Sequence, residues 1–377
     1  TFSEVISLGA ILPFLGVLTA PEQVYQHHLM QPLIEALKLT EPNQLILPIT
    51  IAFIALTLLA GTVRLALLYV MTRISYATGA ELSINIYRRT LYQEYSVHVA
   101  RNSSQVINGI ITKTGTAIGV ITSFLTLMSS IILLFGIIGT LLVINMQIAL
   151  IASIGFGLLY WMVTRYTRQR LERNSQIIAD QSTLMIKSLQ EGLGGIRDVL
   201  IDGSQNFYSQ IYRNADLPLR RASGDNVFIG GSPRFIMEGI GMALIAFLAY
   251  AMTHQQGGIN SAIPVLGALA LGAQRLLPAM QQTYASYSSI KGAKSSLKDV
   301  IKLLEQPLPD YANQPLPAPI PFAKEIELNN LSFRYTKQSP WVLEGINLKL
   351  PKGGRIGFVG ETGSGKSTLI DVIMGLL

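Results

Sequence analysis

The chain has 377 residues, of which 49% are hydrophobic and 14% charged, with a formal net charge of +7 and no cysteine. Soluble domains carry about 25% charged residues, so this composition predicts a protein largely embedded in a membrane. Disulfides and thiolate metal sites are excluded, and the four histidines are scattered without metal-ligand spacing. In a soluble protein the basic charge would predict nucleic-acid binding, but here it falls between apolar segments, and we expect no nucleic-acid partner.

Five long apolar stretches account for six predicted membrane spans. The spans lie near residues 3–20, 45–71, 117–143, 147–163, 227–252 and 259–280. The stretch from Ala117 to Val163 is too long for one span of about 20 residues, so we expect a hairpin that turns near Asn145. The chain opens at Thr1 rather than at a methionine, and we expect the first span to be truncated.

The charge of the connections between spans predicts the orientation. Residues 73–113 and 165–221 are rich in lysine and arginine, whereas the connections on the opposite side carry almost none. By the positive-inside rule the two basic connections are cytoplasmic. We therefore expect an integral protein of the bacterial cytoplasmic (inner) membrane.

Both basic connections are long and patterned. Residues 166–190 are polar, free of proline and compatible with a helix that extends the fourth span beyond the membrane, and residues 191–212 break at paired glycines and then resume. The first connection bends similarly near residues 100–104. These elbows are either ordinary solvated helices or short transverse helices that dock on a nucleotide domain, and the pattern alone leaves both open.

The composition changes after residue 305. Residues 306–321 are rich in proline, which predicts a stiff linker between a membrane domain (1–305) and a second domain (322–377). In the second domain, residues 325–328 and 346–350 alternate as strands do, and Arg355 to Val359 is predicted to be a buried strand. The expected fold class is an α-helical membrane domain followed by the start of an α/β phosphate-loop nucleotide-binding domain.

A complete phosphate-binding loop, G-x-x-x-x-G-K-S, follows that predicted strand. Its glycines let successive backbone N–H groups face phosphate oxygens. Lys366 is expected to reach the β- and γ-phosphates of ATP and Ser367 to ligate Mg²⁺. The predicted ATP-binding residues of the loop are Gly360, Glu361, Thr362, Gly363, Ser364, Gly365, Lys366, Ser367 and Thr368. The alternative, a glycine-rich turn that binds nothing, fits the full motif in its strand-and-helix context poorly.

Three arginines fall inside or beside predicted spans, namely Arg64, Arg234 and Arg275. A charged side chain at mid-bilayer costs roughly 3 kcal/mol or more and usually faces a cavity or a partner. Glu238, four residues after Arg234, is the expected partner on the same helix face. The arginines either snorkel to the interface or line a cavity that binds an anionic headgroup such as a pyrophosphate.

Taken together, the spans, the cytoplasmic extensions, the proline-rich linker and the stretch from LSFRY to GSGKSTL (331–369) resemble ABC exporter half-transporters. These proteins fuse one membrane domain to one ATPase domain, and the resemblance covers the whole chain. It implies that Tyr335 stacks on adenine and that two subunits pair, here as a homodimer. It also implies two coupling helices, at residues 103–107 and 204–212. The candidate coupling residues are Ser103, Ser104, Gln105, Ser204, Gln205, Asn206 and Phe207.

The sequence departs from this family by omission. It contains no Gln-loop, no LSGGQ-type signature, no Walker B carboxylates and no switch histidine. No catalytic residue is therefore assigned. We expect the chain to be a fragment that ends just after the phosphate loop and does not hydrolyse ATP by itself.

A narrower resemblance concerns NSSQVI (102–107), PRFIMEGIG (233–241) and RLLPA (275–279), which are similar to the bacterial lipid-linked oligosaccharide flippases. The amphipathic segment 24–39 resembles the external surface helix of that subgroup. The resemblance implies ATP-driven export or flipping of a lipid-linked oligosaccharide, or a related anionic glycolipid, by alternating access. Two alternatives remain: an exporter of peptides, drugs or other lipids, and a membrane-tethered kinase, which six spans make improbable.

Overall fold

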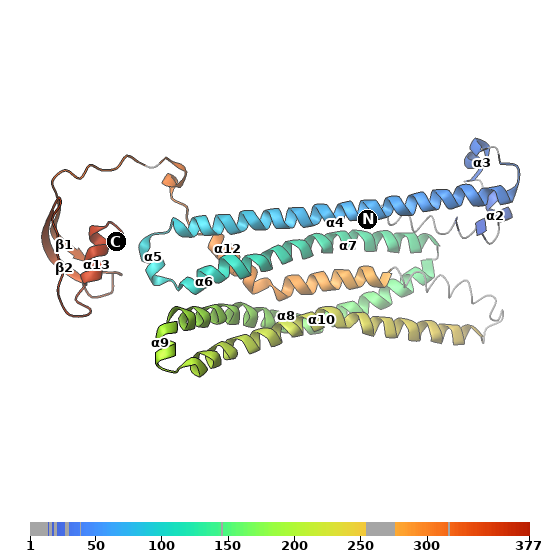
Figure 1. Ribbon diagram of the computed structural model, residues 1–377. Helices are drawn as coiled ribbons and strands as arrows, with labels where there is room; N and C mark the ends of the chain where they lie inside the picture. Colours follow the sequence, from blue (N-terminus) through green and yellow to red (C-terminus); the bar gives the residue numbers. More distant parts are fainter. Residues whose placement is uncertain are drawn as a thin grey trace.

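The computed structural model describes residues 39–144, 146–253, 276–315 and 317–377, together with residues 14, 17–18, 21–26 and 30–37. Most of the predicted spans at 3–20 and 259–280, and Arg275, lie outside the described residues. Figure 1 shows an elongated bundle of long helices with a small α/β unit beyond one end.

Long helices form the bundle. They are α4 (Ile46–Leu91), α7 (Thr114–Ile144), α8 (Met146–Gly194) and α10 (Gln205–Thr253), followed by helical residues 276–292 and α12 (Lys294–Leu304). The predicted hairpin is confirmed, because α7 ends and α8 begins on either side of residue 145. The predicted extension of the fourth span is also confirmed, since α8 runs without interruption to the paired glycines.

Part of the bundle exposes a continuous apolar surface. Segments Pro42–Leu91 and Ser103–Gly139 are long and apolar enough to cross a membrane, judged by length and composition. On α4 the side chains of Leu58, Leu65 and Leu68 are more than 60% exposed, which is apolar surface that water would not favour. The count of six spans stays a prediction.

Short helices close both ends of the bundle. Helices α2 (Pro21–Tyr25), α3 (Gln31–Leu37) and η2 (Pro42–Leu45) lie at one end and carry a small apolar cluster around Val17, Leu45 and Ile49. At the other end, α5 (Tyr95–Ala100), α6 (Ser103–Asn108) and the π-helix η3 (Gly109–Lys113) join α4 to α7, and α9 (Ile196–Ile201) joins α8 to α10.

The main buried cluster joins α7, α8, α10 and helical residues 276–292. Its members are Ile137, Phe156, Tyr160, Leu171, Ile229, Met237, Leu276, Leu277, Ala279 and Tyr284. Leu171 and Met237 are almost fully buried, and burying such side chains stabilises the packing by about 1.5–3 kcal/mol each. This cluster fixes the relative positions of the helices that carry the candidate membrane site.

The proline-rich segment is partly docked rather than free. After α12 the chain forms a 3₁₀ turn, η4 (Asp310–Asn313), against the end of α4. Arg89 donates to the carbonyl of Gln306 at 2.6 Å, and Arg88 donates to the carbonyl of Ala312 at 2.9 Å. The stiffness predicted from proline is therefore supplemented by hydrogen bonds from another helix.

The α/β unit contains a two-stranded antiparallel sheet, β1 (Glu325–Phe333) and β2 (Leu343–Pro351), and helix α13 (Lys366–Ile373). Both predicted strands are confirmed and run longer than the alternation suggested. The predicted buried strand from Arg355 to Val359 is wrong: it has no strand assignment, and Val359 is 99% exposed. Strands of parallel sheets are buried when neighbouring strands and helices flank them, and the described chain gives this segment no strand partner.

Candidate functional site

The phosphate loop closes through two glycines in the left-handed region. Gly363 has φ of 89° and Gly365, which caps α13, has φ of 83°. A Cβ added at Gly365 would lie 2.9 Å from the carbonyl oxygen of Val342, so a larger residue would force the loop away from the strand. The turn therefore needs glycine for both its backbone angle and its close approach.

Lys366 folds back over the loop. Its ammonium donates hydrogen bonds to the carbonyl oxygens of Gly360 at 2.8 Å and Glu361 at 2.6 Å, and lies 3.3 Å from the hydroxyl of Ser364. The loop thus encircles a positive charge at the N-terminal end of α13. A helix N-terminus and an ammonium both attract phosphate, so the charge and the backbone N–H groups of the loop suit a nucleoside triphosphate.

Tyr335 and Thr368 connect the sheet to this loop. Their hydroxyl groups are hydrogen-bonded at 3.0 Å, and the Tyr335 ring is 47% exposed beside the loop. An exposed ring in this place is available to stack on a base. Ser367 is exposed in the first turn of α13, and its role as a Mg²⁺ ligand stays a prediction.

Of the three predicted substrate arginines, the structure describes two. Arg64 is exposed on α4. Arg234 on α10 is paired with Glu238, with 2.9 Å between Nε and Oε1, which confirms the predicted pairing along the helix. Arg234 also lines a cavity of about 350 Å³ between α8, α10 and helical residues 276–292, whereas Arg64 does not. Arg275 lies outside the described residues.

The first candidate coupling segment forms the short helix α6. Asn102 caps it, because its Oδ1 accepts hydrogen bonds from the backbone N–H of Ser104 at 3.0 Å and from the Ser104 hydroxyl at 2.7 Å. Such capping explains why a helix begins at Ser103. Gln105 lies on the same helix and lines a second cavity, of about 510 Å³, between α6, α8 and α12.

The second candidate coupling segment is arranged differently from the expectation. The short helix at this elbow is α9, upstream of the predicted segment 204–212. Ser204 lies in the turn after α9, and Gln205, Asn206 and Phe207 form the first turn of the long helix α10. The break at the paired glycines is where the sequence predicted it, since α8 ends at Gly194, but the short helix follows directly after that break and not at residues 204–212.

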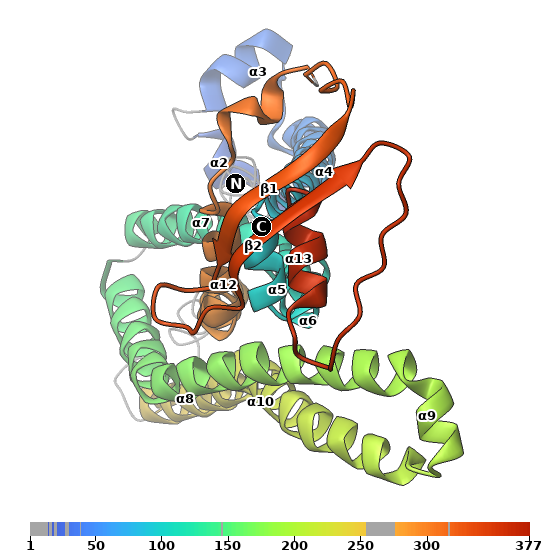
Figure 2. The same cartoon turned by 90° about the vertical axis from the view of Figure 1, so that its left-hand side faces the viewer.

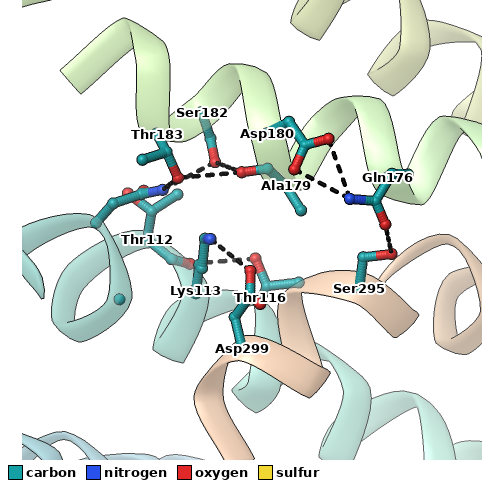
Figure 3. Close-up of polar contacts among 12 residues, drawn as sticks. Thr112, Lys113, Thr116, Gln176, Ala179, Asp180, Ser182, Thr183, Ser295 and Asp299 are labelled. Atoms are coloured by element: carbon teal, nitrogen blue, oxygen red, sulfur yellow. Dashed lines mark hydrogen bonds and ion pairs between the residues drawn. The ribbon is translucent and has the colours of Figure 1, made fainter. Parts of the chain in front are cut away.

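A polar network that the sequence did not predict ties the first elbow to two other helices. Figure 3 shows Lys113 of η3 reaching Asp299 of α12, with 2.6 Å between Nζ and Oδ2. On the other side, Asn108 donates to the hydroxyl groups of Ser182 at 2.9 Å and Thr183 at 3.0 Å on α8. The sequence signal for this network is a single lysine between an elbow and an apolar run. Such a residue belongs to no repeating pattern, so the sequence does not indicate which residue it pairs with.

The carboxylate of Glu172 on α8 forms further ion pairs that join α8 to α12 and the helical residues before it. Lys294 of α12 lies 3.3 Å from Glu172 of α8, and Lys291 lies 3.7 Å from the same oxygen. The hydrogen bond and the charge of Lys294, with the charges of Lys291 and Arg168, hold the pKa of Glu172 below its usual range. The carboxylate is therefore ionised at neutral pH and helps to hold α12 on α8.

Comparison with solved structures defines the class of protein. The chain is similar to a bacterial Atm1-family ABC exporter with ATP bound, with a TM-score of 0.66 and 18% identity over 98% of this chain and 65% of that one. Residues 343–377 match the ABC transporter family model. The chain therefore has the fold of an ABC exporter half-transporter and includes the start of its ATPase domain. The family match implies that this domain binds ATP, and the assignment of ATP to the phosphate loop stays a prediction.

Several curated relatives of the chain carry the same protein name. The chain is 21% identical to the ATP-dependent lipid A-core flippase of Cupriavidus pinatubonensis, over 84% of this chain and 53% of that protein. It is 20% identical to the flippase of the same description from Burkholderia orbicola, over 86% and 54%, and 26% identical to that from Alkalilimnicola ehrlichii, over 58% and 37%. The chain spans about half the length of the first two relatives.

Proposed function

We propose that this chain belongs to an ATP-driven transporter that exports or flips a lipid-linked oligosaccharide, or a related anionic glycolipid, across a bacterial cytoplasmic membrane. One observation carries the proposal. The phosphate loop and both elbows gather at one end of an exporter-fold bundle, while a cavity lined by an arginine lies within the bundle. Such an arrangement suits a machine in which nucleotide binding at one end reorients helices around a substrate.

The cavity supports an amphiphilic, anionic substrate. Arg234 keeps part of its guanidinium free for a ligand, because only its Nε is within hydrogen-bonding distance of Glu238. Guanidinium groups bind phosphate oxygens in a bidentate manner, which a pyrophosphate-linked lipid offers. Arg64 and Arg275 remain proposed contributors to the same path. The relatives described as lipid A-core flippases make a glycolipid the favoured cargo over peptides or drugs.

A second subunit is part of the proposal. The elbow around α9 exposes Leu200, Ile201 and Phe207, each more than 60% exposed, although it lies far along helices that would leave the membrane. An apolar tip of this kind needs a protein partner. We propose that it docks on the ATPase domain of a second half-transporter, which is identical in the simplest assembly, and that ATP with Mg²⁺ lies at the interface of the two.

The test uses the full-length protein in proteoliposomes that contain a fluorescent undecaprenyl-pyrophosphate-linked oligosaccharide. ATP-dependent loss of the glycan from the leaflet that faces the ATPase domains is expected for the wild type and not for Lys366→Ala. Arg234→Gln should lower the initial rate at least 10-fold while basal ATP hydrolysis continues.

Arg220→Gln is the matched control. Arg220 pairs with Asp216 on the same helix with the same spacing, at 3.1 Å, but lies outside the cavity. Equal losses for Arg220→Gln and Arg234→Gln would contradict a role for the cavity. A wild type that hydrolyses ATP but moves no glycolipid would contradict the flippase function and direct the search to peptides and other lipids.

A further inference from the structure

The cavity that contains Arg234 has a second, uncharged half. Its wall includes Tyr160 of α8, Gly230 and Gly231 of α10, and Gln281 and Gln282 of helical residues 276–292. All three segments lie where predicted spans meet the basic, cytoplasmic connections. This is the depth at which the headgroup of a membrane lipid resides, rather than its acyl or prenyl chain.

Tyr160 carries a buried hydroxyl without a partner. The residue is only 8% exposed, and its hydroxyl oxygen makes no hydrogen bond within the described part of the chain. The neighbouring Tyr284 does not bond it, and the Tyr284 hydroxyl is instead bonded to that of Thr167 at 2.9 Å. A buried hydroxyl left unpaired costs about 1–3 kcal/mol, so a ligand that reaches it gains this energy.

The two glutamines offer further uncommitted groups. Among the described residues neither side-chain amide of Gln281 or Gln282 has a hydrogen-bond partner, and each amide both donates and accepts. Space is also available, since a Cβ added at Gly231 would meet no atom within 4 Å. The free groups of this half are therefore neutral, mixed donors and acceptors around an open volume.

The charge of the cavity argues for a neutral ligand in this half. Arg234 is the one charged residue in its described wall, and Glu238 lies 2.9 Å from it. Neutral hydroxyl and amide groups pair best with hydroxyl groups, which also donate and accept. A volume of about 350 Å³ lies at the small end of ligand pockets, which are roughly 300–1,000 Å³.

We propose that Tyr160, Gln281 and Gln282 bind one sugar ring of the transported lipid, the ring next to the phosphate that Arg234 holds. This inference rests on the proposed function and makes it more specific. It assigns discrimination for a glycosylated headgroup to the uncharged half of the cavity, which the phosphate-binding arginine alone would not provide.

Two lipids test the assignment with the full-length protein: undecaprenyl pyrophosphate that carries one N-acetylglucosamine, and undecaprenyl pyrophosphate alone. Affinity is measured from the concentration dependence of the rise in melting temperature in detergent, and transport is measured in proteoliposomes. Tyr160→Phe should weaken binding of the glycosylated lipid about 5-fold, as expected for one lost hydrogen bond, and leave the sugar-free lipid unchanged. Gly231→Leu, which adds a bulky side chain at the wall of the cavity, should act in the same selective way.

Tyr166→Phe is the matched control, because Tyr166 lies on the same helix but is 82% exposed, and it should change neither affinity. Equal weakening of both lipids by Tyr160→Phe, or no weakening, overturns the sugar site while leaving the flippase function intact. If neither lipid raises the melting temperature of the wild type or is transported, both the sugar site and the proposed function fall.

Discussion

Single residues hold the elbows of this bundle in place. Lys113 is the clearest case, because its side chain is 10% exposed and its charge is balanced by Asp299 on another helix. A buried ammonium without a counter-charge is costly, since the surrounding protein solvates it poorly. This contact therefore helps to hold η3 against α12, beside the apolar packing of Ile110 against the cluster that contains Val300.

We expect Asp299→Asn to destabilise the protein by about 2 kcal/mol. Breaking one partner of a fully buried pair costs about 3–5 kcal/mol, and Asp299 is about a third exposed, which reduces the cost. The measurement is the free energy of unfolding of the detergent-solubilised protein in denaturant. The double variant Lys113→Met, Asp299→Leu should recover most of the loss, and a neutral Asp299→Asn would show that the pair does not hold the elbow.

Residues of the nucleotide loop could be predicted from the sequence, whereas those of the network could not. The loop from Gly360 to Thr368 is local, so its spacing alone specifies glycines in the left-handed region and a lysine at the start of a helix. Lys113 and Asp299 are 186 residues apart, and their meeting depends on how three helices pack. Tyr160 was likewise hidden, because a tyrosine in an apolar run has the same appearance in a sequence whether or not its hydroxyl is satisfied.

At the scale of elements, the linker and the end of α4 act as one structural unit. The segment from Gln306 to Asn313 accepts hydrogen bonds from three side chains at the end of α4. Arg88 donates to the Ala312 carbonyl and the Asn313 side chain, Arg89 donates to the Gln306 carbonyl, and the Gln93 amide donates to the Pro307 carbonyl at 2.8 Å. These hydrogen bonds hold the end of α4 against the segment that leads into the α/β unit.

Arg89→Ala should release this segment. A hydrogen bond from a charged donor is worth about 1.5–3 kcal/mol, so we expect amide hydrogen exchange in residues 306–313 to quicken at least 10-fold. The measurement is hydrogen exchange followed by mass spectrometry on the detergent-solubilised protein. Arg73→Ala is the control, since Arg73 lies on the same helix and, within the described part of the chain, donates a hydrogen bond only to Tyr69, at 3.2 Å. Unchanged exchange in both variants would contradict docking.

Element boundaries followed from the sequence wherever a local signal exists. Paired glycines end α8, Asn102 opens α6, and alternation reveals β1 and β2. The segment from Arg355 to Val359 was wrongly predicted to be buried, because its apolar character specifies a strand in a complete sheet. Burial depends on neighbouring strands, and the two-stranded sheet of the described chain does not provide them.

For the whole molecule, the arrangement of the two elbows matters most. Figure 2, viewed from the α/β end, shows α8 and α10 diverging from the other helices so that α9 stands away from α5 and α6. The two elbows are thus far enough apart to contact different surfaces. One elbow lies near the α/β unit of its own chain, and the other is free to meet a different molecule.

Leu200→Asp should uncouple the transporter without unfolding it. Leu200 is 61% exposed on α9, so a charge there costs little within the subunit but disrupts an apolar contact with a partner. In the full-length protein we expect glycolipid transport to fall at least 10-fold while ATP binding persists. Ile320→Asp, at an apolar linker residue that is 93% exposed, should transport normally, and normal transport by Leu200→Asp would argue against docking through α9.

Docking of the linker on α4 also limits how far the α/β unit can lie from the bundle. The contacts of Arg88 reach Asn313, and β1 begins at Glu325, which leaves residues 314–324 to span the gap. Eleven residues at about 3.3–3.6 Å each extend to at most about 40 Å. If the chain were free from the end of α12 onward, the same calculation over residues 305–324 would give about 70 Å. The two arginines of α4 thus nearly halve the distance that the α/β unit can reach from the bundle, and thereby raise its effective concentration there for the proposed partner subunit.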